Sequence, residues 1–478
     1  MNFQDLIQDE ALLAAITKLN WQYPTPIQQK AIAIISNNRS IVMQADTGSG
    51  KTGAYGLGVL SKISWEKRYA QCLIIAPTRE LVLQIKNDIE HIGKYKRIKC
   101  VALIGKEPMA QQQHDLKQRH QVICATPGRL LDHITQGNVS LEAITHIVID
   151  EVDELCSMGF FDSVCEILDF IKQSCQYCFC SATIDENVEA LVKRYANSYD
   201  VISVQLDKLK HNFTNELYIL NGEDRLAFLW KLLLHECGGS TIVFCNTRET
   251  SETLYRTLKK RLKHTVLYNG AMDQRKRESE LEKFYSGEAQ LMIATDIAAR
   301  GLDIEKVELI INYDLPENAV RFQHRAGRSG RGGENGHIIT LASENDAALL
   351  KQMEELTECS FTLCENKRIL AAADDQAALT RLLSKRQLKK KKGAGFQTDI
   401  TRLYLHAGKN KKLRAKDIVG AVCQLPNVSF DDIGIIEIQE NGSYVEILND
   451  KGRYVCEQLK QRTIKNHKIK VELSHKQY

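Results

Sequence analysis

An eight-residue run near the N-terminus, Ala45-Asp-Thr-Gly-Ser-Gly-Lys-Thr52, has the composition and spacing of a phosphate-binding loop. It departs from the template G-x-x-x-x-G-K-[ST] only at its first residue. In such a loop the glycines let backbone N–H groups face a triphosphate, the lysine reaches the β- and γ-phosphates, and the last hydroxyl completes a Mg²⁺ shell. A plain glycine-rich turn before a helix is the alternative. The predicted nucleotide contacts here are Thr47, Gly48, Ser49, Gly50, Lys51 and Thr52.

A second group of reactive residues is the acidic run Asp150-Glu-Val-Asp153, which follows the apolar run Ile147–Ile149. At the tip of a strand, Asp150 is predicted to hold Mg²⁺, directly or through water. Glu151 is predicted to orient or deprotonate the attacking water. The alternative is that these acids only cap the N-terminus of a helix. The presence of a phosphate-binding loop in the same chain favours nucleotide hydrolysis.

Arginines that meet the charge of a transferred phosphoryl group are available in His324-Arg-Ala-Gly-Arg-Ser-Gly-Arg331. Arg325 and Arg328 are predicted to complete the catalytic site from a second lobe, so that hydrolysis requires lobe closure. An RNA-binding patch or a surface ion-pair network are the alternatives for this run.

These residues must be positioned by two α/β units, because short apolar runs alternate with helical patterns over the first 360 residues. This rhythm is typical of parallel sheets with crossover helices. It restarts after a polar connection near residues 206–212, so we expect two tandem parallel-sheet domains, at residues 1–206 and 207–364, with a cleft between them. The predicted strands are Ser40–Gln44, Gln71–Ala76, Val122–Ala125, Ile144–Ile149 and Gln176–Ser181, then Ser240–Cys245, His264–Tyr268, Gln290–Ala294, Lys306–Asn312 and Gly336–Leu341.

The C-terminal part has a different organisation. A helical and basic linker is predicted at residues 365–397, and residues 398–478 follow the order β-α-β-β-α-β of a split βαβ motif. This α+β order matches the architecture of RNA-recognition motifs, which other ferredoxin-like folds share. Residues 385–478 contain 20 Lys and Arg against 10 Asp and Glu, whereas the rest of the chain is net acidic. A basic tail of this kind predicts a polyanionic partner, with a solubilising tail as the alternative.

Composition excludes several classes of protein. No apolar run reaches the ~18 residues of a membrane span, and the acidic N-terminus lacks the features of a secretion signal, which predicts a cytoplasmic protein without membrane contact. The 14 cysteines are therefore expected to be reduced thiols. Cys175, Cys178 and Cys180 lack a second pair at zinc-site spacing, which favours thiols near a buried strand over a metal site.

Across residues 1–345 the order of these motifs resembles that of DEAD-box ATP-dependent RNA helicases, which implies two RecA-like domains. Trp21-Gln-Tyr-Pro-Thr-Pro-Ile-Gln28 resembles the adenine-binding Q motif, so Gln28 is expected to bond the base edge and Trp21 to stack on it. The resemblance implies a nucleotide contact at Asp303 and coupling of hydrolysis to unwinding through Ser181, Thr183 and His324. The RNA contacts that it implies in the two lobes are Pro77, Thr78, Arg79, Gly105, Thr126, Gly128, Arg129, Thr295 and Arg300.

The tail resembles the RNA-binding domain of the DbpA-type subgroup, on the basis of Thr398–Gly408 and Asp432–Ile436. This resemblance implies docking on a hairpin of large-subunit ribosomal RNA near the peptidyl-transferase centre. The expected contacts are basic residues around the first helix of the domain: Lys409, Lys411, Lys412 and Arg414.

The function expected from the sequence is an ATP- and Mg²⁺-dependent RNA helicase that locally unwinds or remodels short duplexes. We expect it to act as a monomer on 23S rRNA and pre-ribosomal particles during assembly of the large ribosomal subunit. Three alternatives remain open: an ATP-gated RNA clamp or assembly scaffold, a general RNA remodeller with a non-specific basic tail, and a DNA-directed helicase.

Overall fold

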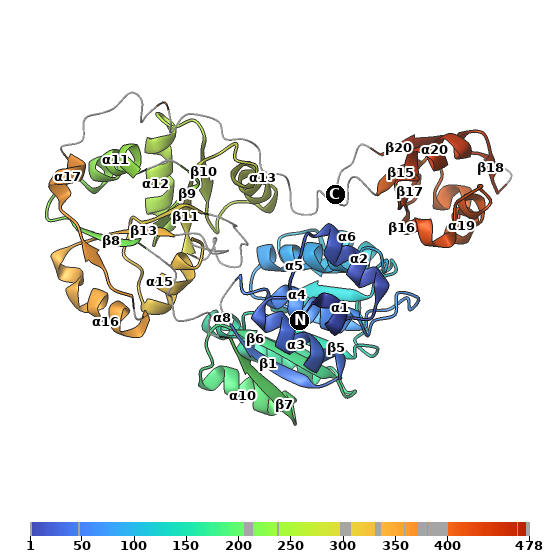
Figure 1. The fold of residues 1–478 in the computed structure, drawn as a ribbon, viewed down its shortest axis with the longest axis horizontal. Coiled ribbons are helices and arrows are strands. Elements are labelled where there is room, and N and C mark those ends of the chain that lie inside the picture. Colours follow the sequence, from blue (N-terminus) through green and yellow to red (C-terminus); the bar gives the residue numbers. More distant parts are fainter. Residues whose placement is uncertain are drawn as a thin grey trace.

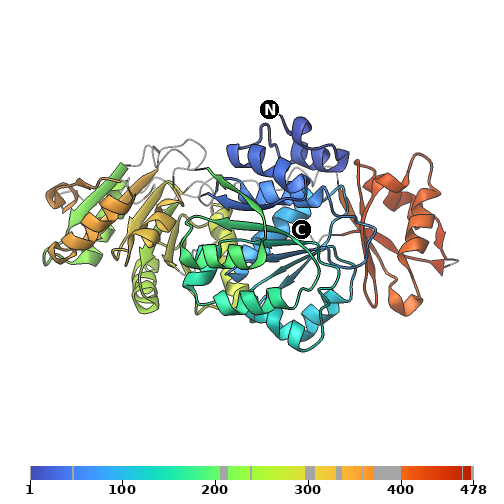
Figure 2. The ribbon, with the colours of Figure 1, turned by 90° about the horizontal axis from the view of Figure 1, so that it is seen from below.

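The computed structural model contains three folded units connected in series. It describes residues 2–45, 48–204, 214–236, 239–296, 307–329, 336–357, 359–370, 380, 400–465 and 467–474. The first unit (lobe 1) lies between the second (lobe 2) and the C-terminal domain (Figures 1 and 2). No helix among the described residues has the length and apolarity needed to cross a bilayer.

Lobe 1 is built on a seven-stranded parallel sheet in the order β3-β4-β2-β5-β6-β1-β7. One apolar cluster contains Ile41 and Met43 and a second contains Val42, so neighbouring positions of β1 face opposite sides of the sheet and both sides are covered. The strands are β1 (Ser40–Gln44), β2 (Cys72–Ile75), β3 (Cys100–Leu103), β4 (Val122–Ala125), β5 (His146–Ile149), β6 (Gln176–Ser181) and β7 (Tyr199–Ser203). The helices are α1 (Phe3–Leu6), α2 (Glu10–Lys18), α3 (Pro26–Ser36), α4 (Lys51–Leu60), α5 (Arg79–Ile92), α6 (Met109–Leu116), α7 (Pro127–Thr135), α8 (Val152–Ser157), α9 (Phe161–Asp169) and α10 (Glu186–Tyr195).

Lobe 2 repeats this architecture with the strand order β10-β11-β9-β12-β13-β8-β14, again all parallel. Its strands are β8 (Thr214–Ile219), β9 (Thr241–Cys245), β10 (Thr265–Tyr268), β11 (Leu291–Thr295), β12 (Leu309–Asn312), β13 (His337–Ala342) and β14 (Thr362–Leu363). Its helices are α11 (Arg225–Glu236), α12 (Arg248–Lys259), α13 (Gln274–Tyr285), α15 (Ala319–Ala326), α16 (Ala347–Thr357) and α17 (Asn366–Leu370).

The predicted start of the linker at residue 365 is wrong, because α17 belongs to lobe 2. Ile369 is fully buried in the lobe 2 core, and Asn366 donates through Nδ2 to the backbone oxygen of Ile219 at 2.6 Å. The predicted boundary between the lobes, at residues 206 and 207, lies outside the described residues.

The C-terminal domain is a four-stranded sheet in the order β16-β17-β15-β20, with all pairs antiparallel. Its strands are β15 (Thr401–Leu405), β16 (Ile433–Ile438), β17 (Ser443–Ile447) and β20 (Val471–Leu473), with a small hairpin of β18 (Thr463–Ile464) and β19 (His467–Lys468). Helices α19 (Ala415–Cys423) and α20 (Gly452–Lys460) pack on one face of the sheet, as their shared apolar cluster shows. The predicted β-α-β-β-α-β order is confirmed.

Candidate active site and nucleic-acid interface

The phosphate-binding loop connects β1 to the N-terminus of α4, as the sequence predicts. Gly48 and Gly50 have φ values of 87° and 95°, a left-handed conformation that favours glycine. The Lys51 ammonium group is buried and donates to the backbone oxygen of Ala45, at the start of the loop. Thr47 lies outside the described residues.

The Q-motif residues pack directly beneath this loop. Thr25 donates through Oγ1 to the backbone oxygen of Ser49 at 2.9 Å, and Gln28 donates through Nε2 to that of Gly50 at 3.3 Å. The other amide atom of Gln28, Oε1, accepts from the Thr25 backbone N–H at 2.9 Å. Gln28 thus bonds to the loop through Nε2 and to Thr25 through Oε1, and each of these atoms keeps a second hydrogen or lone pair that can bond the edge of a base.

Trp21 and Gly53 complete this contact between α3 and α4. The half-buried Trp21 ring stacks on Phe3, with ring centroids 6.3 Å apart. A Cβ atom at Gly53 would lie 2.5 Å from Gln28 Nε2 and 2.9 Å from the Trp21 ring, so only glycine permits this approach. The predicted stacking of Trp21 on a base stays a prediction.

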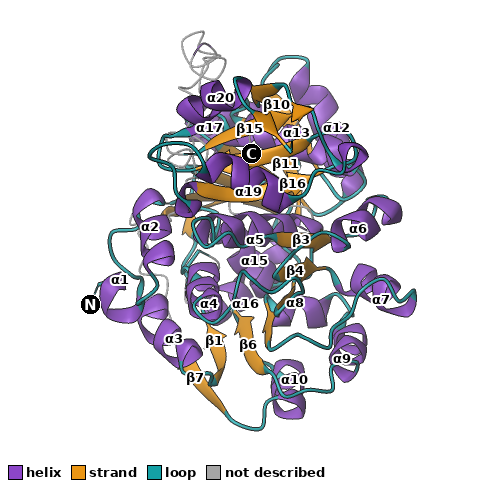
Figure 3. Ribbon diagram, turned by 90° about the vertical axis from the view of Figure 1, so that its right-hand side faces the viewer, coloured by secondary structure: helices purple, strands orange, loops and turns teal. Residues whose placement is uncertain are grey.

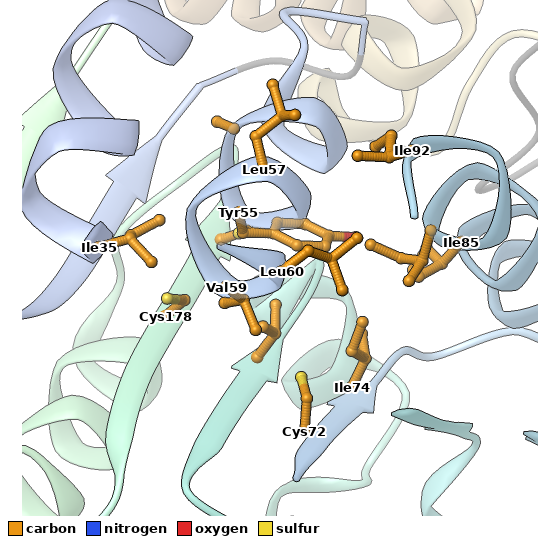
Figure 4. Close-up of a cluster of buried hydrophobic side chains, with 14 of the residues drawn as sticks. Ile35, Tyr55, Leu57, Val59, Leu60, Cys72, Ile74, Ile85, Ile92 and Cys178 are labelled. Atoms are coloured by element: carbon orange, nitrogen blue, oxygen red, sulfur yellow. The ribbon is translucent and has the colours of Figure 1, made fainter. Parts of the chain in front are cut away.

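The acidic residues lie at the carboxyl end of β5. Asp150 is buried, and the Tyr55 hydroxyl donates to its Oδ2 at 3.0 Å. The Tyr55 ring lies in the lobe 1 core, near Leu60, Ile74 and Ile85 (Figure 4). Thr52 precedes Tyr55 by about one turn of α4, so Tyr55 lies near both predicted metal ligands, Thr52 and Asp150.

Burial controls the protonation of both acids. It raises the pKa of Asp150, against the opposing charge of Lys51. Burial, and next the charge of Asp150, raise the pKa of Glu151 to about 7, although Lys51 and Arg328 act in the opposite direction. A carboxyl group whose pKa lies near the working pH is suited to exchange a proton with water.

Asp153, which the sequence interpretation did not select, joins the acidic run to the predicted coupling residues. Its Oδ2 accepts from the Thr183 backbone N–H at 2.9 Å, from Thr183 Oγ1 at 3.0 Å and from the Ala182 backbone N–H at 3.1 Å. The Ser181 hydroxyl accepts from the Asp153 backbone N–H at 3.2 Å. This network ties the carboxyl end of β6 to α8.

The two predicted catalytic arginines occupy different positions in lobe 2. Arg328 is buried, and its charge acts on Glu151 across the cleft. Arg325 is only 1% exposed, and its guanidinium group is bound within lobe 2. It donates to both carboxylate oxygens of Asp296 at 2.5 and 2.7 Å, and to the side-chain oxygens of Asn312 at 3.1 Å and Asn246 at 2.7 Å. In this structure Arg325 joins α15 to the ends of β9, β11 and β12, and its predicted catalytic contact stays a prediction.

Two further contacts connect the lobes. His324 Nδ1 lies 4.0 Å from Glu154 Oε2 on α8, as its predicted bridging position requires. Arg277 on α13 forms an ion pair with Glu80 on α5, with 3.1 Å between Nη2 and Oε2 and both side chains buried. No local sequence pattern marks the two residues as partners, since they are almost 200 positions apart on different lobes.

Predicted RNA contacts line the carboxyl ends of strands in lobe 1, where ligands of parallel sheets bind. Residues Pro77, Thr78 and Arg79 follow β2, Gly105 follows β3, and Thr126, Gly128 and Arg129 follow β4. A Cβ atom at Gly105 or Gly128 would meet nothing within 4 Å, so these positions leave room for a ligand.

Several polar atoms beside these strands have no hydrogen-bond partner within the described part of the chain. They include Arg79 Nη1, Glu80 Oε1 and Gln274 Oε1, all buried. Burial lowers the pKa of Arg79, and the like charges of Arg277 and Arg129 act in the same direction. The guanidinium groups can bind phosphates, and the unpaired polar atoms can bond to hydroxyl groups. Together they suit a ligand that has both, such as a polyanion with ribose hydroxyls. In lobe 2, Thr295 ends β11 and is buried, whereas Arg300 and Asp303 lie outside the described residues.

The predicted RNA-binding lysines of the C-terminal domain, Lys409, Lys411 and Lys412, are exposed on the turn after β15, and Arg414 precedes α19. Lys411 Nζ donates to the backbone oxygen of His406 at 3.1 Å, and Lys465 Nζ donates to that of Lys412 at 2.7 Å. These bonds hold several positive charges on one loop.

Family comparisons match all three units. A DEAD/DEAH box helicase model matches residues 25–191, a helicase conserved C-terminal domain model matches residues 224–333, and a DbpA RNA binding domain model matches residues 402–473. The chain belongs to the DEAD-box ATP-dependent RNA helicases. It is of the DbpA type, with two RecA-like lobes and a C-terminal RNA-binding domain.

Individual relatives support this assignment over the whole chain. The ATP-dependent RNA helicase DbpA of Bacillus subtilis is 36% identical over 472 residues, which cover 97% of this chain and 98% of the relative. DbpA of Escherichia coli is 29% identical, with 97% of each chain covered. Among solved structures, Saccharomyces cerevisiae Dbp5 bound to RNA and ADP BeF3 is 26% identical, with a TM-score of 0.71 over 80% of this chain and 100% of Dbp5. This DEAD-box helicase is thus an enzyme that uses ATP to act on RNA.

Proposed function

We propose that this helicase locally unwinds short duplexes of 23S rRNA during assembly of the large ribosomal subunit. It acts as a monomer in the cytoplasm, on pre-ribosomal particles. The observation that carries this proposal is the C-terminal domain, which matches the DbpA RNA-binding model and exposes a lysine-rich loop. Phosphate contacts from such a loop add affinity, while the core binds RNA without reading its sequence.

ATP hydrolysis depends on residues of both lobes. The buried Lys51 binds the phosphates, and Glu151 accepts a proton from the attacking water, because its pKa of about 7 leaves much of it ionised near neutral pH. Arg328 approaches from lobe 2 and stabilises negative charge that develops on the transferred phosphoryl group. Hydrolysis therefore proceeds only when the lobes are together.

The residues present fit a magnesium ion. The Thr52 hydroxyl and the Asp150 carboxylate, which the Tyr55 hydroxyl holds by a hydrogen bond, are oxygen ligands of the kind that Mg²⁺ prefers. Burial raises the pKa of Asp150 because it disfavours the charged carboxylate, and a cation beside the carboxylate would stabilise that charged form. When bound, Mg²⁺ supplies positive charge to the β- and γ-phosphates.

Binding of RNA and hydrolysis of ATP are coupled through the contacts between the lobes. Lobe closure forms the Arg277–Glu80 pair and brings Arg328 toward Glu151, so ATP and RNA each favour the same arrangement. The coupling is reciprocal: ATP must tighten RNA binding by the factor by which RNA tightens ATP binding. Closure bends one strand of a short duplex and releases the other.

The proposed RNA target is tested by measuring the ATPase rate under three conditions. These are no RNA, poly(A), and a 23S rRNA fragment of the peptidyl-transferase region. We expect strong stimulation by the rRNA fragment alone, lost in Lys411→Glu/Lys412→Glu and in a chain that ends before Thr398. Lys193→Glu, an exposed lysine of α10, is the control for the change of charge. Equal stimulation by poly(A) would leave a general RNA remodeller.

Strand displacement separates a helicase from a clamp. A duplex of about ten base pairs should be released in the presence of ATP, whereas a clamp would hydrolyse or hold without releasing a strand. A loading strand made of deoxyribonucleotides should not support the reaction. Equal turnover with DNA would contradict the proposed use of RNA.

A further inference from the structure

The C-terminal sheet has an outer face that carries two carboxylates beside its aromatic residues. Leu403, Val445 and Ile447 point toward α19 and α20, so the alternate residues of β15 and β17 face outward. That outer face carries Glu446 and Tyr444 on β17, Glu437 on β16, and Arg402 and Tyr404 on β15. RNA-recognition motifs stack bases on this face, and here Tyr404 and Tyr444 are half-buried aromatic residues of that kind, but the two carboxylates are paired with cations, two of which come from lobe 1.

Lobe 1 approaches this outer face and supplies a buried ion pair. Lys94 Nζ, just after α5, lies 3.0 Å from Glu446 Oε1, and the two side chains are 6% and 4% exposed. Gly434 makes room for the carboxylate, because a Cβ atom there would lie 2.8 Å from the Glu446 Cβ. A buried charge that loses its partner is strongly destabilised, so the pair holds the two surfaces together.

Arg97 of lobe 1 makes a second contact with geometric specificity. Its Nε donates to the backbone oxygen of Ile433 at 2.8 Å, and its Nη2 donates to that of Phe430 at 2.7 Å. The guanidinium carbon lies 4.1 Å from the ring centre of Phe430 and 4.9 Å from that of Trp65. An arginine that contacts two aromatic rings and two carbonyl oxygens is well matched to this site.

Further charged and apolar contacts extend this interface. Lys99 lies 2.9 Å from Glu437. Burial alone would raise the pKa of Glu437, but Lys99, and to a smaller extent Arg402 and Lys86, bring it below its usual value. An apolar cluster adjoins these pairs, made of Ala15, Leu19, Tyr95, Ile400 and Leu448. In Figure 1, β16 lies on the side of the C-terminal domain that faces lobe 1 and α19 lies on the far side, so α19 stands in front of lobe 1 in the view of Figure 3.

We propose that the outer face of the C-terminal sheet is a docking surface for lobe 1, and that the domain moves with lobe 1 as a unit. Lobe 1 contributes the cations and the sheet contributes the carboxylates. Lys411 and Lys412 of the lysine-rich loop are exposed and make none of these contacts with lobe 1, so docking leaves the loop open to RNA. The docking does not depend on which RNA the domain recognises.

Energy transfer between two dyes on the full-length chain tests the docking. The dyes are placed at Lys117 of lobe 1 and Lys460 of α20, which are exposed and make none of the contacts above. We expect one narrow population with high transfer. In Lys94→Glu, the ratio of docked to undocked molecules should fall by about tenfold or more, because Glu446 is left without its partner. The exchange Lys94→Glu/Glu446→Lys should restore it.

Matched variants separate docking from misfolding and from RNA binding. Lys193→Glu has the same change of charge at an exposed site and should leave the transfer unchanged. Arg97→Ala lies in lobe 1 and should undock the domain without any change in the C-terminal fold. Lys411→Glu should weaken RNA binding and leave the energy transfer unchanged. Lys94→Glu should lower the energy transfer and leave RNA affinity unchanged. Unchanged transfer in both Lys94→Glu and Arg97→Ala, or loss of RNA affinity in Lys94→Glu equal to that in Lys411→Glu, would overturn the proposal.

Discussion

Replacing Arg277 by methionine is expected to separate RNA binding from the nucleotide state. The Arg277–Glu80 pair crosses the cleft at 3.1 Å, with side chains 5% and 7% exposed. Arg277→Met keeps the length of the side chain and removes its charge, which leaves the Glu80 carboxylate buried and unpaired whenever the lobes are together. In separated lobes the same carboxylate meets water, so the cost applies to the closed arrangement alone.

The magnitude follows from this burial. Removing one partner of a buried pair costs about 3–5 kcal/mol. We take the lower value, because only one of the two Glu80 oxygens is paired. A cost of about 3 kcal/mol corresponds to a shift of about 150-fold in the closure equilibrium.

The assay is the dissociation constant of a fluorescent single-stranded RNA, measured with and without a non-hydrolysable ATP analogue. The tightening of RNA binding by the analogue should fall by about two orders of magnitude in Arg277→Met. Arg275→Met, an exposed arginine on the same helix, should keep the tightening. Glu80→Gln combined with Arg277→Met should recover part of it, since no buried charge remains. The reasoning is refuted if Arg277→Met and Arg275→Met behave alike, or if RNA affinity falls equally with and without the analogue.

Three further predictions concern single groups. Glu151→Gln should bind ATP but lose hydrolysis, and the wild-type kcat should rise from pH 6 to pH 8 as Glu151, with a pKa of about 7, becomes ionised; a flat profile would exclude Glu151 as the base. Tyr55→Phe removes one hydrogen bond to Asp150, worth about 1 kcal/mol, and should raise the Mg²⁺ concentration needed for half-maximal ATPase by about fivefold. Burial alone would raise the pKa of Asp432, but hydrogen bonds, chiefly from Lys451, lower it to about 2. The stability that Asp432 provides is therefore present above pH 4 and lost as pH falls toward 2, so acid unfolding of Asp432→Asn, followed by circular dichroism, should be less steep over that range.

The sequence was sufficient for the central strands and the nucleotide residues. The buried strands β1, β4, β5 and β6 are short apolar runs, and their predicted positions agree with the structure to within two residues. Strands β3, β7, β8 and β14 were missed. β7 and β14 lie at sheet edges, where one side faces solvent and the apolar run is broken by polar residues.

The side-chain partners could not be predicted in the same way. Motif spacing located Arg325, but its bonds to Asp296 and Asn312 depend on which strands are neighbours in lobe 2. The contacts of Lys94 with Glu446 join residues more than 350 positions apart, and no local pattern marks either one. Asp153 was visible in the sequence, yet only the position of β6 beside β5 shows what its carboxylate binds.

The strand order of lobe 1 also sets a length scale. β6 lies between β1, which carries the phosphate-binding loop, and β5, which carries the acids. Two strand spacings of ~4.8 Å separate the loop from the acidic edge by about 10 Å. The strand order therefore sets the distance between the backbone that binds the phosphates and the backbone that carries Glu151, and Lys51 and Tyr55 reach across that distance toward the acids. Which phosphate lies nearest to Glu151 thus depends in part on the order of the strands.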